Sequence, residues 1–123
     1  MNPTPKIHRG RRRSLRVELA VPLRVVWQGR DGARREERIA TAVVNAHGCL
    51  LTLRAPLLAG APLEITHGET GAVRRGRVVW CGEVAPDGRT RVGVELADSA
   101  PEFWGSGYAE AFYAATTAEL WVG

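Results

Sequence analysis

From Val17 onward, every second residue of the chain is apolar as far as Trp27, while Glu18, Arg24 and Gln28 fall on the other parity. Because successive side chains of a β-strand point to opposite faces, this period of two predicts a strand with one face buried. One face of that strand thus belongs to a core. The segment therefore commits the chain to a β-sheet fold.

Turn signals divide the next part of the chain into further short strands. Asp31-Gly32 predicts a hairpin that returns through residues 34–44 as an antiparallel second strand. Pro86-Asp87-Gly88 predicts a second hairpin, which joins strands at 72–81 and 90–96; others are expected at 49–53 and 62–66. Six short strands at this spacing predict a mainly β fold, a small six-stranded antiparallel barrel, rather than a βαβ fold.

The C-terminal segment differs from the rest in composition. It begins at Pro101 and holds six of the eight Phe, Trp and Tyr residues, and the alanine-rich stretch 109–120 predicts a helix that packs on one end of the barrel. With 123 residues the chain is long enough for one core. We therefore divide a single domain into a basic N-terminal arm (1–16), a barrel (17–100) and a C-terminal aromatic, helical segment (101–123).

The positive charge is concentrated in the arm. The net charge is +4, but the residues before Val17 carry +6 and no acid, so the remainder carries −2 (+4 minus +6). This distribution disfavours a surface that grips duplex DNA along its length, and it favours a compact anion as the partner. The alternative is a solvated N-terminal tail. The basic residues of the arm are Lys6, Arg9, Arg11, Arg12, Arg13 and Arg16.

Several classes of function lack any signal in the sequence. No apolar run is long enough to span a bilayer, and residues 1–10 lack the apolar core of a secretory signal. Cys49 and Cys81 lie in apolar runs, which favours buried thiols and a reducing, cytoplasmic location. The histidines have no zinc-ligand spacing, and no catalytic or phosphate-cradling motif is present. We expect no enzyme activity, catalytic residue, metal site, cofactor or membrane contact.

Two segments carry a resemblance to a known family. The arm contains the pattern Arg-x-x-x-Arg in Arg12-Arg13-Ser14-Leu15-Arg16, directly before the first strand, and the second predicted strand is followed by Gly48. On these residues and the ending 92–96, the chain from Arg11 to about Trp104 resembles the PilZ domain family of bacterial cyclic di-GMP receptors. The resemblance implies a six-stranded PilZ-like barrel with a C-terminal helix and a role in second-messenger signalling.

The resemblance also implies a binding site for cyclic di-GMP. Its residues here would be Arg12, Arg13 and Arg16 on the arm, with Asn45 and Gly48 on the barrel side. The family's second motif, Asp or Asn-x-Ser-x-x-Gly, is eroded: aligned on Gly48, it has Val43 at the acid position and Asn45 at the serine position. Gly48 is expected to adopt a positive φ in the turn.

The chemistry of arginine fits such a ligand on independent grounds. A guanidinium group can bind phosphate oxygens bidentately, donate to guanine O6 and N7, and stack on a purine. We therefore expect a nonenzymatic domain whose arm clamps cyclic di-GMP against the barrel. Two alternatives remain: a degenerate domain that acts through contacts with a protein partner, and an arm that binds nucleic acid without specificity, which the charge distribution disfavours.

Overall fold

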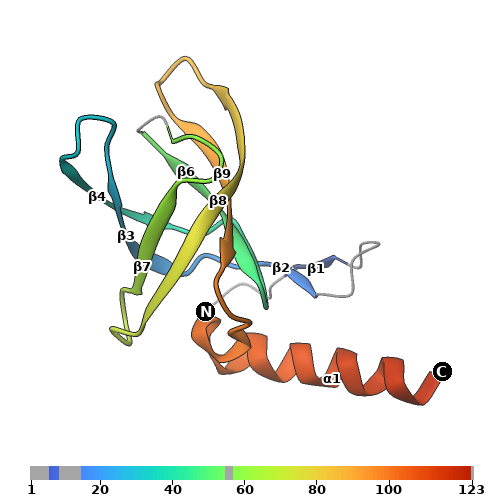
Figure 1. Cartoon of the computed structure of the whole chain (residues 1–123). Helices are drawn as coiled ribbons and strands as arrows, with labels where there is room; N and C mark the ends of the chain where they lie inside the picture. The colour runs from blue at the N-terminus through green and yellow to red at the C-terminus, as the bar shows by residue number, and fades with distance from the viewer. Residues whose placement is uncertain (1–5, 9–14, 55–56, 123) are drawn as a thin grey trace.

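The computed structural model describes residues 6–8, 15–54 and 57–122, with side chains for 15–54 and 57–114. These residues form one antiparallel sheet followed by a short 3-10 helix, η1 (Pro101–Trp104), and a helix, α1 (Ser106–Val122) (Figure 1). The strands are β1 (Lys6–His8), β2 (Arg16–Glu18), β3 (Pro22–Gln28), β4 (Arg34–Ala40), β5 (Val43–Asn45), β6 (Gly48–Leu53), β7 (Pro62–His67), β8 (Val73–Val84) and β9 (Thr90–Leu96).

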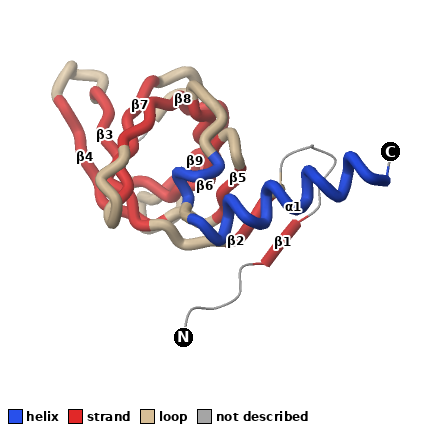
Figure 2. The backbone as a smooth tube through the Cα atoms, turned by 90° about the horizontal axis from the view of Figure 1, so that it is seen from below, coloured by secondary structure: helices blue, strands red, loops and turns tan. Residues whose placement is uncertain are grey.

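The expected mainly β fold with a C-terminal helix is confirmed, but the closed barrel of six strands is wrong. The described residues form nine strands in the order β1-β2-β5-β6-β9-β8-β7-β3-β4, so the ladder has two ends, at β1 and β4. The sheet still curls strongly: the β3–β4 hairpin splays away from the ring to which β6 to β9 belong, and β1 lies outside this ring near α1 (Figures 1 and 2). The result is a curled sheet whose two end strands, β1 and β4, do not pair with each other.

The strand count rises from six to nine because two predicted strands each break in the middle and Lys6–His8, in the predicted arm, forms β1. The alternation from Val17 to Trp27 is interrupted, so that β2 pairs with β5 whereas β3 pairs with β4 and β7. Residues 34–44 likewise divide into β4 and β5. Pro22 stands at the first position of β3, where the missing N–H is tolerated. The apolar period of two continues through the break because both pieces bury the same face.

Both breaks meet at the hydroxyl group of Thr41. This residue is 3% exposed, and its hydroxyl donates to the Leu19 carbonyl oxygen at 2.5 Å and accepts from the Val21 N–H at 2.8 Å. The Thr41 N–H donates in turn to the Val21 carbonyl oxygen. The crossing of the two chain segments is therefore held by one side chain that satisfies backbone groups which the broken strands leave unpaired.

We expect Thr41→Val to destabilise the protein by about 2–3 kcal/mol, because valine has a similar shape but leaves a buried carbonyl and a buried N–H without a partner. Urea denaturation measures this change. Thr66→Val is the matched control: the Thr66 hydroxyl oxygen is buried without a hydrogen-bond partner, so its removal should be neutral or stabilising. Equal effects of the two substitutions would contradict a bridging role for Thr41.

The concave face of the sheet holds the hydrophobic core, and η1 and the start of α1 cover one end of it. Phe103, Trp104 and Tyr108 are each at most 4% exposed, so the aromatic residues at the start of this segment pack as core, as expected. Cys49 is a buried free thiol, and desolvation raises its pKa to about 12. It therefore stays protonated and is not a reactive nucleophile. The largest fully buried side chains are those of Val25, Val44, Leu51, Leu53, Ile65, Val78 and Val92.

Candidate functional site

The turn between β5 and β6 shows which way the eroded motif points. Val44 is fully buried, whereas its neighbours Val43 and Asn45 are half-buried on the opposite, outer face of the sheet. Val43 lies opposite Leu50 of β6, and Asn45 lies opposite Gly48. The two motif positions therefore share the outer face, while Val44 anchors the strand in the core.

Strand β2 brings Arg16 to this same place. In its antiparallel pairing with β5, Val17 lies opposite Val44 and Glu18 opposite Val43. Continuing the register by one residue sets Arg16 level with Asn45, and directly opposed residues project from the same face. Arg16 is half-buried. Two of the five expected site residues, far apart in sequence, thus lie on neighbouring strands at one level of the outer face.

Arg12 and Arg13 lie outside the described residues. They fall between β1 and β2, which pair antiparallel to each other with His8 opposite Arg16. The described chain resumes at Leu15, whose carbonyl oxygen accepts a hydrogen bond from the Tyr108 hydroxyl at 3.0 Å. Burial raises the pKa of Tyr108 to about 12, so this phenol remains a donor at neutral pH. The root of the arm is thereby tied to α1.

Asn45 is held by two contacts that limit what it can offer a ligand. Its side-chain oxygen Oδ1 accepts from the His47 N–H at 2.7 Å, and its carbonyl oxygen accepts from Trp104 Nε1 at 2.6 Å. The first contact is an Asx turn, which fixes the side-chain amide. The amide NH₂ group remains available as a donor. Asn45 is therefore better placed to donate to a phosphate than to accept from guanine.

Gly48 has a different role from the one expected. Its φ is not positive, and it is buried. A Cβ atom built on Gly48 would lie 1.9 Å from the Val94 carbonyl oxygen and 3.2 Å from Glu95 Cα. The glycine is thus required because β6 and β9 approach closely here, not because of the turn conformation. Its contribution to the outer face is to hold the two strands together beneath it.

Trp80 is a feature of the same face that the sequence reasoning missed. It is 50% exposed and lies opposite Gly93, in a row that continues through Leu50 to Val43. Gly82 makes room for the ring, since a Cβ atom there would lie 3.1 Å from Trp80 Cη2; a Cβ atom on Gly93 would make only an ordinary contact, 3.5 Å from Trp80 Cβ. The signal for this feature in the sequence was that Gly93 falls on the face opposite Val92 and Val94, next to the apolar run that contains Trp80. Val43, Leu50 and Gly93 thus form an apolar row, which we call the apolar shelf. The exposed indole of Trp80 lies at its far end.

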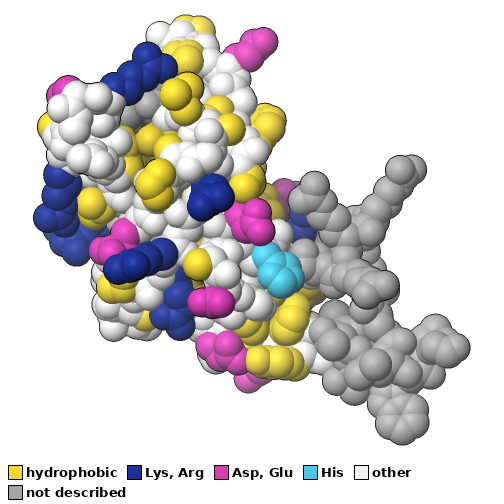
Figure 3. Space-filling view, in the orientation of Figure 1, with side chains coloured by type: hydrophobic (Ala, Val, Ile, Leu, Met, Phe, Trp, Pro, Cys, Tyr) yellow, Lys and Arg dark blue, Asp and Glu magenta, His cyan; other side chains and the backbone are white. Residues whose placement is uncertain are grey.

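The polar groups next to this shelf are of both signs. Glu95 lies opposite Arg77 on one side and opposite Gly48 on the other. Because Gly48 in turn lies opposite Asn45, these residues form one row across the sheet. Both charged residues are exposed. On the face displayed in Figure 3, basic, acidic and apolar side chains alternate without one large basic field. This surface suits a ligand that carries anionic and apolar parts together.

The described residues contain no cluster of three or more His, Cys, Asp or Glu side chains that could hold a metal ion. His67 is buried, and its Nδ1 accepts from the backbone N–H groups of Glu69 and Thr70, so it closes a turn. Within the same part of the chain, no helix is long and apolar enough to cross a membrane.

Comparison with solved structures defines the class: the architecture is PilZ-like. One similar structure is the PilZ domain with c-di-GMP of YcgR from Escherichia coli, with a TM-score of 0.55 and 13% sequence identity over 89% of this chain and 95% of that chain. No family model and no curated protein matches the sequence. At this identity the comparison establishes the fold, which agrees with the fold that the arm and the 45–48 turn led us to expect.

Proposed function

We propose that this chain is a nonenzymatic, PilZ-type receptor domain for cyclic di-GMP. The arm, through Arg12, Arg13 and Arg16, holds the phosphates and one guanine, and clamps the dinucleotide against the outer face of the sheet. Cyclic di-GMP is a ligand here and not a cofactor. A bacterial, cytoplasmic setting and a role in second-messenger signalling belong to the same proposal.

The observation that carries the proposal is the juxtaposition of Arg16 and Asn45 beside an apolar shelf that ends at Trp80. Arginine and the Asn45 amide supply donors for a dianion, and the shelf and the indole supply surfaces for bases. The solved YcgR structure of the same fold contains c-di-GMP. These features support a ligand with two phosphates and two purines over a simple inorganic anion.

Calorimetric titration with cyclic di-GMP tests the proposal directly, beside a single-stranded oligonucleotide of mixed sequence. We expect saturable binding of the cyclic dinucleotide and no saturable binding of the oligonucleotide. Oligonucleotide binding that weakens steeply with salt would instead assign the arm to nonspecific nucleic-acid contact. No binding of either would leave a domain that acts through protein contacts, the second candidate from the sequence.

The missing acceptor at Val43 can be restored. Val43 is half-buried on the outer face, so a polar side chain there remains in contact with solvent. We expect Val43→Asn to tighten cyclic di-GMP binding by about tenfold or more, since one added hydrogen bond to a guanine donor contributes about 1–3 kcal/mol. Asparagine is preferable to aspartate because position 43 lies directly opposite Glu18, and like charges in that arrangement destabilise a sheet.

Calorimetry on the Val43→Asn protein measures this gain, and the melting temperature checks the fold. Val44→Asn is the matched control, because Val44 is fully buried and an asparagine there would lack partners. It should destabilise the protein strongly. An unchanged affinity in a stable Val43→Asn protein would show that position 43 does not face the bound ligand.

We expect Trp80→Ala to weaken cyclic di-GMP binding by about tenfold to a hundredfold, because stacking of a base on an aromatic side chain contributes about 1–3 kcal/mol. Trp80→Phe should retain most of the affinity. The exposed Val84, near the far end of β8, provides a control for loss of surface hydrophobicity, and Val84→Ala should leave binding unchanged. Equal affinities of all three variants would remove the indole from the site.

A further inference from the structure

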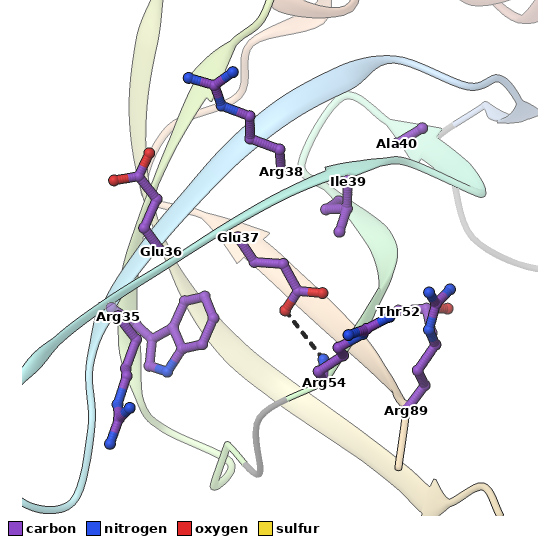
Figure 4. Close-up of a pocket in the computed structure, with 10 residues that line it drawn as sticks. Arg35, Glu36, Glu37, Arg38, Ile39, Ala40, Thr52, Arg54 and Arg89 are labelled. Carbon is purple, nitrogen blue, oxygen red and sulfur yellow. Dashed lines mark hydrogen bonds between the residues drawn. The ribbon is translucent and has the colours of Figure 1, made fainter. Parts of the chain in front are cut away.

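The curled sheet has an open seam between β4 and the second half of β6. Strand β4 is the last strand of the sheet, and the β5–β6 ladder ends where Val43 meets Leu50. One hydrogen bond, from the Ala42 N–H to the Leu50 carbonyl oxygen at 3.0 Å, pins the seam at this end. Beyond it the β3–β4 hairpin diverges from the neighbouring strands (Figure 2). A cleft of about 650 Å³ lies along the two edges (Figure 4).

The hydrogen bonds on either side show which backbone groups point into the seam. The Thr41 N–H donates to the Val21 carbonyl oxygen at 3.0 Å, so the odd-numbered residues of β4 bond to β3. In an antiparallel ladder the alternate residues turn their N–H and C=O groups to the other edge. Glu36, Arg38 and Ala40 therefore present theirs to the seam.

The same reasoning applies to the facing edge of β6. The Leu96 N–H donates to the His47 carbonyl oxygen at 2.6 Å, so the odd-numbered residues of β6 bond to β9. The backbone N–H and C=O groups of Thr52 and Arg54 thus point toward β4. A carboxylate oxygen of Glu37 accepts from the Arg54 N–H at 3.1 Å (Figure 4). This side chain does what the carbonyl group of a neighbouring strand would do.

The side chains along the cleft favour an acidic occupant. Four arginines (Arg35, Arg38, Arg54 and Arg89) and two glutamates (Glu36 and Glu37) line it. Arg35 and Arg89 are paired with Asp31 and Asp87, so the attraction for an acidic group rests on Arg38 and Arg54. Among the described residues, no carboxylate lies within 4.0 Å of the guanidinium groups of Arg38 and Arg54. Trp27 and Ile39 add an apolar lining to the same cleft.

We propose that this seam binds an extended, acidic peptide segment of a protein partner, which adds as a strand to the free edge of β4. Backbone hydrogen bonds from Glu36, Arg38 and Ala40 supply affinity in this mode of recognition, and side chains of alternate peptide residues supply specificity. The peptide's acidic residues meet the cleft arginines, and its carbonyl groups can take over the Arg54 N–H from Glu37. This site is separate from the proposed nucleotide face.

A second copy of the chain fits this edge less well. In an antiparallel pair of β4 edges, the even-numbered residues of one copy must face even-numbered residues of the other, because these carry the free N–H and C=O groups. A twofold axis between the copies then passes through one residue of the strand and its equivalent in the second copy. That residue then lies opposite itself. Every residue from Arg34 to Arg38 is charged, so each central register sets two like charges face to face, which destabilises the pair.

Selection of short random peptides on the whole chain tests the proposal, followed by binding measurements with the synthetic peptides. The matched variants are Arg38→Ala and Arg38→Pro: both remove the charge, but only proline also removes the edge N–H, at a position where the β3 ladder does not use it. We expect enriched peptides with Asp or Glu at alternate positions. They should bind the proline variant about tenfold more weakly than the alanine variant.

Two peptides, one methylated on the odd-numbered and the other on the even-numbered backbone nitrogens, give a test that does not depend on the folding of the proline variant. One of the two methylated peptides should fail to bind, and the other should bind like the unmodified peptide. Hydrogen exchange should slow at the amides of Arg38 and Thr52 when peptide binds. Failure to enrich any peptide, or equal binding to the two Arg38 variants, would overturn the proposal. A dimer that Arg38→Pro converts to monomer would assign the edge to a second copy instead.

Discussion

Gly48→Ala is expected to lower the stability of the protein by about 3 kcal/mol or more, one of the larger effects that a single added methyl group can produce. The new Cβ would lie 1.9 Å from the Val94 carbonyl oxygen. Because both sides of this contact are backbone, no rotamer change can relieve it. β6 and β9 would have to separate at the centre of the sheet. Thermal and urea denaturation measure the change.

Gly93→Ala is the matched control for this prediction. Gly93 also belongs to the paired β6–β9 region, but a Cβ there would be 3.5 Å from its nearest neighbour, Trp80 Cβ, which is an ordinary contact. We expect its stability to stay within about 1 kcal/mol of the unmodified protein. A Gly48→Ala protein as stable as the Gly93→Ala protein would show that the strand approach is looser than described.

The double substitution Arg12→Ala with Arg16→Ala should weaken cyclic di-GMP binding by at least about a hundredfold. Each charge-assisted hydrogen bond to the ligand contributes about 1.5–3 kcal/mol, so two arginines together exceed two decades in affinity. If the two arginines act only on the ligand, stability should change by less than about 0.5 kcal/mol. Calorimetry and thermal denaturation of the same samples provide both values.

The control must remove the same charge elsewhere. Arg30 and Arg34 lie on the exposed tip of the β3–β4 hairpin, and their double alanine variant also loses two positive charges. If that variant loses as much affinity as the arm variant, long-range attraction rather than a clamp accounts for binding. A large fall in melting temperature of the arm variant would mean that the arm is packed structure.

The alternation of apolar and polar residues predicted which face of each strand is buried, but not where the strands begin and end. The apolar period from Val17 to Trp27 correctly assigned the buried face, and the Asp-Gly turn correctly assigned the β3–β4 hairpin. The break between β2 and β3 could not be predicted, because the odd-numbered residues are buried in both strands. Local sequence preferences also contain no information on where two distant chain segments cross. The cause of the break is the Thr41 hydroxyl, a contact between residues about twenty positions apart in sequence.

The candidate site shows the same division between local and distant information. The period of two sets Val43 and Asn45 on one face of the strand and Val44 on the other, and the structure shows that the shared face is the outer one. The reason for Gly48 did not follow, because a close approach of β9 leaves no trace in neighbouring residues. Trp80 was likewise hidden, because the residues that share its row, Gly93 and Leu50, become its neighbours only through strand pairing. Arg12 and Arg13 stay predictions.

The hydrogen bonds from the C-terminal segment have a consequence for how the molecule opens. Tyr108 is bonded to Leu15 at the root of the arm, and Trp104 to Asn45 beside it. The C-terminal segment thus contacts both β2 and the β5–β6 turn, and local opening of η1 together with the start of α1 releases the two at once. Such a group of segments behaves as one cooperative unit, or foldon. A ligand that binds Arg16 and Asn45 would therefore also slow the opening of η1 and the start of α1, which hydrogen exchange can measure.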